Sequence, residues 1–212
     1  MSMSFPPRRL VAGEASLHKN QLRPACLLPG ASRPTTVGAD TIGAMQERWK
    51  PSVTVAAVIA RETQGEPEFL LVEEHTLEGL RLNNPAGHLD PGESPEQGVI
   101  REALEETARV FVPDRIVGVY LSRFQRPATS EDVTYLRVAY GGRVGDAQPH
   151  RALDTGIVRT LWMTLAELCA SRARHRSPLV LRCVGDYLAG RSFPLDLLQC
   201  DETVYAPEIK GP

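Results

Sequence analysis

From residue 87 to residue 107 the chain reads Gly87-His-Leu-Asp-Pro-Gly-Glu-Ser-Pro-Glu-Gln-Gly-Val-Ile-Arg-Glu-Ala-Leu-Glu-Glu-Thr107, and this stretch decides its fold. Ser94 is a favourable N-cap, and Pro95 suits the first helical position. Gln97 stands where it completes a capping box with Ser94. The spacing therefore predicts a turn followed by a helix from about Pro95 to Ala108.

The last two turns of this predicted helix are strongly acidic. At about 100° per residue, Glu102, Glu105 and Glu106 gather on the side opposite an apolar stripe. Like charges at these spacings cost roughly 0.2–0.5 kcal/mol per pair, and the helix C-terminus disfavours anions further. One explanation is a solvated face with Arg101 and Arg109 as partners. The other is a hard divalent cation, which turns the repulsion of converging carboxylates into attraction.

The spacing favours the cation, because the stretch resembles the Nudix box. That pattern is Gly, five residues, Glu, seven residues, Arg-Glu, an aliphatic residue, any residue, Glu-Glu, any residue, Gly. At roughly 6–7% per fixed residue type, six matches arise by chance about once in 10⁷ windows. The residues in register are Gly87, Glu93, Arg101, Glu102, Ala103, Glu105 and Glu106. One departure is Ala108 at the final glycine position, which makes a left-handed helix end less comfortable.

The resemblance implies an α/β protein with the Nudix fold, a mixed β-sheet sandwiched between helices. It also implies an Mg²⁺-dependent hydrolase, with Mn²⁺ as a possible substitute. The metal ligands would be Glu102, Glu105 and Glu106, with a main-chain carbonyl of Ala86 or Gly87. Either one of these acids or an acid from a later loop would accept the proton from water, and similarity to the family favours Glu105.

The same resemblance assigns Arg101 to the catalytic machinery, paired with Glu93 so that it orients the acidic face. Substrate contacts are expected from Asn83, Asn84 and His88, which flank the entrance to the box. The alternatives are that the two asparagines are turn residues and that His88 is structural.

Five further segments resemble the NudJ group of bacterial Nudix phosphatases: residues 49–55, 71–74, 84–89, 176–180 and 193–195. This implies nucleoside di- and triphosphates and hydroxymethylpyrimidine diphosphate as substrates, with release of orthophosphate. Leu82 stands where the group often has an aromatic residue, so we expect broad specificity. Two alternatives stay open: a pyrophosphohydrolase acting on ADP-ribose or dinucleoside polyphosphates, and a non-catalytic nucleotide-binding regulator.

Strands and helices are interleaved along the rest of the chain. Residues 165–174 are predicted to be helical, and Ser177-Pro178 is predicted to open a helix that ends at Gly190. The predicted strands are residues 52–60, 68–73, 110–112, 116–124, 133–138 (ended by Gly141-Gly142) and 157–163.

The whole sequence bounds the other possibilities. A formal net charge of −2 over 212 residues gives no sign of nucleic-acid binding. No apolar run approaches 18 residues, which argues against a membrane span. The four cysteines are scattered without a CxxC pair, so free thiols in a reducing cytoplasm are expected. We expect small diphosphate partners and a monomer or homodimer.

Residues 1–44 differ in composition from the remainder, with five prolines and five basic residues against two acidic ones. They are interpreted as a disordered leader or an over-extended start before Met45, and a transit peptide is the alternative. The catalytic domain is then expected over residues 45–200, followed by a tail over residues 201–212.

Overall fold

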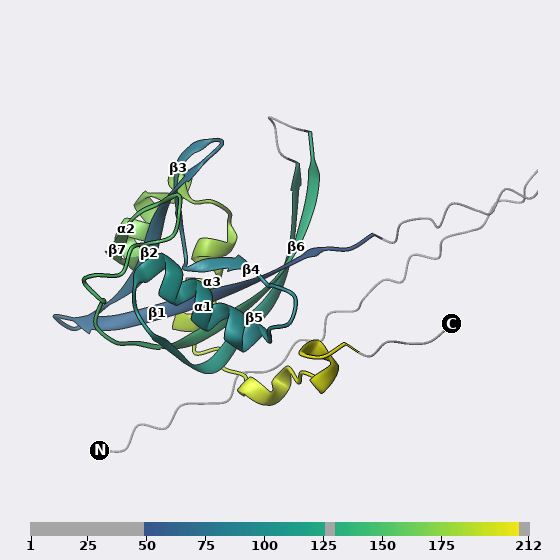
Figure 1. Ribbon diagram of the computed structural model, residues 1–212. Coiled ribbons are helices and arrows are strands. Elements are labelled where there is room, and N and C mark those ends of the chain that lie inside the picture. The colour runs from purple at the N-terminus through teal and green to yellow at the C-terminus, as the bar shows by residue number, and fades with distance from the viewer. Residues whose placement is uncertain (1–48, 126–129, 208–212) are drawn as a thin grey trace, which may run out of the picture. The chain divides into compact units, whose positions relative to one another are not determined.

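The computed structural model describes residues 49–125 and 130–207 (Figure 1). The strands are β1 (Ser52–Thr63), β2 (Glu66–Thr76), β3 (Gly79–Asn83), β4 (Ala86–His88), β5 (Phe111–Gln125), β6 (Asp132–Val144) and β7 (Ile157–Thr164). The α-helices are α1 (Pro95–Thr107), α2 (Leu165–Ala170) and α3 (Leu179–Leu188). Three 3₁₀ turns follow α2 or α3: Arg172–Arg174, Leu195–Leu197 and Glu202–Val204.

Strand β1 is the centre of the seven-stranded sheet, in which the hydrogen-bonded order is β3-β2-β1-β6-β5. The first half of β1 runs parallel to β6 and antiparallel to the short strand β4. Its second half pairs antiparallel with β2, and β2 also pairs with β7. Parallel and antiparallel pairs therefore coexist, as predicted for a mixed sheet.

Each face of the sheet carries its own apolar core, because successive residues of a strand point to opposite faces. Val55, Ala57 and Ile59 of β1 pack with Val99 and Ala103 of α1. On the other face, Val58 packs with residues of α2 and α3. Helices thus cover both faces of the sheet, with α1 on one and α2 and α3 on the other (Figure 1). The expected α/β/α sandwich is confirmed.

Helix α1 begins as its sequence predicts. The Ser94 hydroxyl accepts a hydrogen bond from the Gln97 backbone, and the Gln97 side chain accepts one from the Ser94 backbone. At the other end Ala108 takes the left-handed conformation with φ 53°, and its N–H donates to the Leu104 carbonyl. The chain therefore leaves this helix through the left-handed cap, even though a non-glycine residue occupies it.

The predictions for β5 and β6 were wrong in two respects. Residues 111–112 and 116–124 belong to one strand, because the register shifts around Pro113 absorb the proline without ending the pairing with β6; residue 110 lies before it. Gly141-Gly142 does not end β6, which continues to Val144. A Cβ at Gly142 would lie 2.3 Å from the Val112 carbonyl oxygen, so glycine permits the close approach of the two strands.

The two later helices are shorter than predicted. Helix α2 ends at Ala170 and a 3₁₀ turn replaces its expected continuation to Arg174. Helix α3 begins after Pro178, with no side-chain cap at that position, although the Ser177 hydroxyl accepts from the Leu179 N–H. It ends at Leu188 rather than Gly190, which follows with a positive φ of 73°.

The interpretations of residues 1–44 lie outside the described residues. Within the described part of the chain, Cys169, Cys183 and Cys200 are free thiols, as expected. In that same part no helix is both long and apolar enough to cross a membrane. Cys200 and Tyr205 line a small hollow together with the start of α1, and residues 201–207 are exposed.

Candidate active site

The site lies where α1 crosses β4. Strand β4 pairs with the first half of β1, with Gly87 opposite Val55 and His88 opposite Thr54. This pairing brings Gly87 directly over the carboxylate of Glu102, such that a Cβ at position 87 would lie 2.1 Å from the carboxyl carbon. Only glycine leaves room for the carboxylate against this backbone. The glycine that opens the motif and the first glutamate of its acidic group are therefore in contact.

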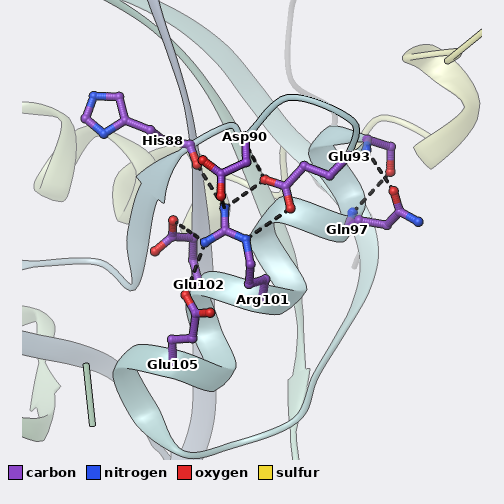
Figure 2. Close-up of polar contacts among 8 residues, drawn as sticks. His88, Asp90, Glu93, Gln97, Arg101, Glu102 and Glu105 are labelled. Carbon is purple, nitrogen blue, oxygen red and sulfur yellow. Dashed lines mark hydrogen bonds and ion pairs between the residues drawn. The ribbon is translucent and has the colours of Figure 1, made fainter. Parts of the chain in front are cut away.

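Arg101 organises the acidic face (Figure 2). Its Nε and Nη2 donate to the two carboxylate oxygens of Glu93 at 3.0 and 2.7 Å. Nη1 donates to Glu102 at 2.8 Å and to Glu105 at 3.1 Å, and Nη2 also reaches the His88 carbonyl at 3.0 Å. One guanidinium thus fixes the turn that precedes the helix, strand β4 and two of the three glutamates relative to one another.

The carboxylates experience different environments. Arg101 lowers the pKa of Glu93 through its hydrogen bonds. Burial raises the pKa of Glu102, although Arg101 partly opposes the effect. Burial raises the pKa of Glu106 to about 8, and the Ala86 N–H donates to Glu106 at 2.8 Å. Two buried carboxylates therefore lie side by side beneath β4, with Glu102 disfavouring the charge on Glu106.

A polar cavity of about 280 Å³ opens onto this pair of carboxylates. Glu105 is half-buried beside Arg101 and does not line it. Asp154, an acid from a later loop that the motif does not mark, does line the cavity, and its N–H donates to the Glu105 carbonyl at 2.9 Å. The other lining residues are Glu74, His75, Ala86, Gly87, His88, Asp90, Glu102, Glu106, Thr155, Gly156 and Ile157.

The residues fit a hard divalent cation by their chemistry. Two buried carboxylates next to the Ala86–Gly87 backbone supply the oxygen donors that Mg²⁺ prefers, and their mutual repulsion is what a cation relieves. No cluster of three metal-binding side chains is assembled among the residues described, because Arg101 holds Glu105 and one oxygen of Glu102.

Two of the three predicted substrate contacts line a cavity and the third does not. Asn83 and His88 line a second cavity of about 110 Å³, which adjoins the first across β4. Asn84 is buried and lines neither cavity. Leu82, where the NudJ group often has an aromatic residue, is also fully buried and lines neither cavity. Its side chain is in the core because β3 pairs with β2 at this point, with Leu82 opposite Glu73.

Comparison with known proteins agrees with this geometry. The NUDIX domain family matches residues 50–183, so the chain belongs to the Nudix family. It is 30% identical to the protein "Phosphatase NudJ" of Escherichia coli strain K12 over 151 residues, which cover 71% of this chain and 92% of that protein.

Solved structures give the same assignment. A NUDIX hydrolase from Nitrosomonas europaea is 46% identical, with a TM-score of 0.64, over 72% of this chain and 98% of that one. The NUDIX domain of Shewanella oneidensis NrtR, solved with ADP ribose, is 19% identical with a TM-score of 0.54, over 66% of this chain and 90% of that one. The second likeness concerns the fold alone. The chain is a Nudix hydrolase, a family that generally uses a divalent cation and acts on small molecules.

Proposed function

We propose that this Nudix hydrolase uses Mg²⁺, or Mn²⁺ in its place, to cleave phosphoanhydride bonds of nucleoside di- and triphosphates and related small diphosphates, releasing orthophosphate. The observation that carries the proposal is the pair of buried carboxylates, Glu102 and Glu106, facing a glycine backbone at the floor of a polar cavity. Burying two acids this closely is unfavourable unless a cation joins them.

The metal would be held by Glu102 and Glu106, by Glu105 once Arg101 yields its hydrogen bond, and by a carbonyl of Ala86 or Gly87. A bound divalent cation neutralises phosphate charge and makes a coordinated water more acidic. Glu105 is half-buried at the edge of the acidic face, which suits it to accept the proton from an attacking water.

Arg101 and Glu93 act through positioning. The paired hydrogen bonds between them hold the Arg101 guanidinium against Glu102 and the His88 carbonyl. This keeps β4 and α1 in a fixed relation. The carboxylates of α1 and the backbone carbonyls of Ala86 and Gly87 would therefore present one fixed geometry to the metal and the diphosphate. Since these contacts involve only the diphosphate end of a substrate, the organic group must be recognised elsewhere.

The release of orthophosphate is supported by the 30% identity to a protein described as a phosphatase. Product analysis tests this point: the purified protein is incubated with Mg²⁺ and nucleoside di- and triphosphates, hydroxymethylpyrimidine diphosphate, ADP-ribose or a dinucleoside polyphosphate. Phosphorus NMR then distinguishes orthophosphate from pyrophosphate and AMP. Pyrophosphate or AMP as the main product would contradict the proposal, and tight binding without turnover would indicate a regulator.

A matched pair of variants ties the activity to the site. Glu106→Gln keeps the shape of the side chain and should lower turnover by at least about a hundredfold, equivalent to about 2.7 kcal/mol of activation free energy. Glu96→Gln makes the same change on an exposed position of the same helix and should leave turnover unchanged. Equal turnover of the two variants at saturating Mg²⁺ would exclude Glu106 from the metal site.

A further inference from the structure

A third cavity, of about 440 Å³, lies at the C-terminal end of α1. It shares no lining residue with the polar cavity of the active site or with the second cavity. Its size falls within the roughly 300–1,000 Å³ that sites for small-molecule ligands span. We name it the Trp162 cavity; its lining residues are Ala60, Arg61, Arg109, Arg143, Val144, Gly145, Asp146 and Trp162.

The fold brings three arginines from separate segments to this cavity. Strand β1 runs parallel to β6 with Ile59 opposite Gly142, so Arg61 and Arg143 lie at the same end of the sheet. Arg109 follows α1, and the Gly145 N–H donates to the neighbouring Val110 carbonyl at 3.3 Å. This bond holds the end of β6 beside the residue that leaves the helix.

Trp162 of β7 supplies an aromatic wall. Part of its side chain packs against the apolar core between the sheet and α1. The guanidinium of Arg61 lies 4.2 Å from the ring centroid, and that of Arg109 lies 5.9 Å from it. Contact with the ring orients a guanidinium but leaves the N–H groups in its own plane available to a ligand.

The arginines of this cavity are incompletely paired. Arg143 is exposed, and its guanidinium makes no hydrogen bond or ion pair with the other described residues. Arg109 donates through Nη1 to the Gly145 carbonyl at 2.8 Å, but its Nε is buried and has no hydrogen-bond partner in the described part of the chain. A buried donor without an acceptor is unfavourable.

The balance of charge in the cavity is positive, although the chain as a whole has a formal charge of −2. Arg61 is neutralised by Glu68 at 2.6 Å, and Asp146 is the single carboxylate among the lining residues. Arg109 and Arg143 therefore outweigh Asp146. This surplus disfavours a cation, and guanidinium groups match the oxygens of a phosphate through paired hydrogen bonds.

We propose that the Trp162 cavity is a second, non-catalytic binding site for a phosphate-bearing small molecule, with Arg109 and Arg143 holding the phosphate beside Trp162. With one carboxylate it has no counterpart of the acidic face on α1, so the ligand is bound there and not cleaved. The phosphate can belong to a nucleotide or to a free phosphate compound, because the arginines recognise the group that the two share.

The fluorescence of Trp162 can report occupancy, because Trp49 and Trp162 are the only tryptophans of the chain. Trp49 is 71% exposed, so Trp49→Phe leaves the fold intact and assigns all tryptophan fluorescence to Trp162. This full-length protein is titrated in EDTA, at constant ionic strength, with inorganic pyrophosphate and separately with AMP. Calorimetry follows the same titrations. Tighter binding of AMP would identify a nucleotide as the source, and equal or tighter binding of pyrophosphate a free phosphate compound.

A matched pair of arginine variants locates the bound probe. Arg143→Met should weaken its affinity at least about tenfold, the loss of one hydrogen bond to a charged group. Arg151→Met makes the same change at an exposed position that lines none of the three cavities, and it should leave the affinity unchanged. Absence of saturable binding of both probes, an unchanged affinity in Arg143→Met, or an equal loss in both variants would overturn the proposal.

Discussion

Replacing Glu106 by glutamine should stabilise the metal-free protein while it abolishes activity. Glu106 is 7% exposed, and burial raises the pKa of its carboxyl group from 4.5 to about 8. Between these two values the folded protein keeps a proton that the unfolded chain releases. Stability of the wild type therefore falls as pH rises from 4.5 to 8, by about 1.4 kcal/mol per pH unit. The Ala86 N–H retains an acceptor in the glutamine variant.

The expected difference depends on pH. At pH 7 the variant should be more stable by about 3 kcal/mol, and at pH 5 by only about 1 kcal/mol. For a domain of this size, 3 kcal/mol corresponds to roughly 6–12 °C in melting temperature. Thermal melts of wild type, Glu106→Gln and the exposed control Glu96→Gln in EDTA at both pH values measure this difference. Glu96→Gln should lose at most about 1 kcal/mol, the favourable interaction of an acid with the helix N-terminus, and should show no gain in stability at pH 7.

Addition of Mg²⁺ should reverse the order. A ligand that binds only the folded state raises its stability, and the wild type should gain far more than Glu106→Gln because the variant lacks one charged donor. A variant that melts at or below the wild type at pH 7 in EDTA would refute the burial argument. An equal Mg²⁺ shift in both proteins would refute the role of Glu106 in binding the metal.

Three further outcomes follow from the contacts. Gly87→Ala places a Cβ 2.1 Å from the Glu102 carboxyl group and should lower turnover at least about tenfold. Gly185→Ala adds a Cβ in open space and should leave turnover unchanged. Equal kcat values for the two variants would contradict the need for glycine at position 87. Arg101→Lys cannot keep both hydrogen bonds to Glu93 and should lower kcat more than it raises KM, so an unchanged kcat would contradict its positioning role. Burial raises the pKa of the Cys183 thiol to about 11, so native protein at pH 8 should leave it unlabelled by a thiol reagent, as mass spectrometry can check.

The sequence predicted α1 most accurately because its signals are local. The capping box of Ser94 and Gln97 lies within four residues, and the structure forms both of its hydrogen bonds. The spacing of the acids likewise placed Glu102 and Glu106 on one helix face. It could not show that this face is buried, because burial depends on how β4 pairs with β1.

The second cavity was missed for the same physical reason. Arg137, Phe124 and Tyr135 come from two strands that follow the motif, and no spacing in the sequence relates them to residues 87–107. Leu82, where the NudJ group often has an aromatic residue, is next to the motif in sequence, but its side chain lies in the core. One sign of this cavity was visible in the sequence. Val133, Tyr135 and Arg137 alternate along one strand, so a charged side chain lies on the same face as an apolar one.

Strand β4 contributes residues to both cavities. Its residues alternate between the faces of the sheet, so Gly87 meets the carboxylates of α1 while His88 joins the row of Thr54 and Arg137. Gly87 and His88 line both cavities, so a single strand separates the two hollows. The hydrogen bond from Arg101 to the His88 carbonyl couples the two sides, because a shift of β4 would move both binding surfaces together. Arg101→Lys should therefore disturb the second cavity as well as slow turnover.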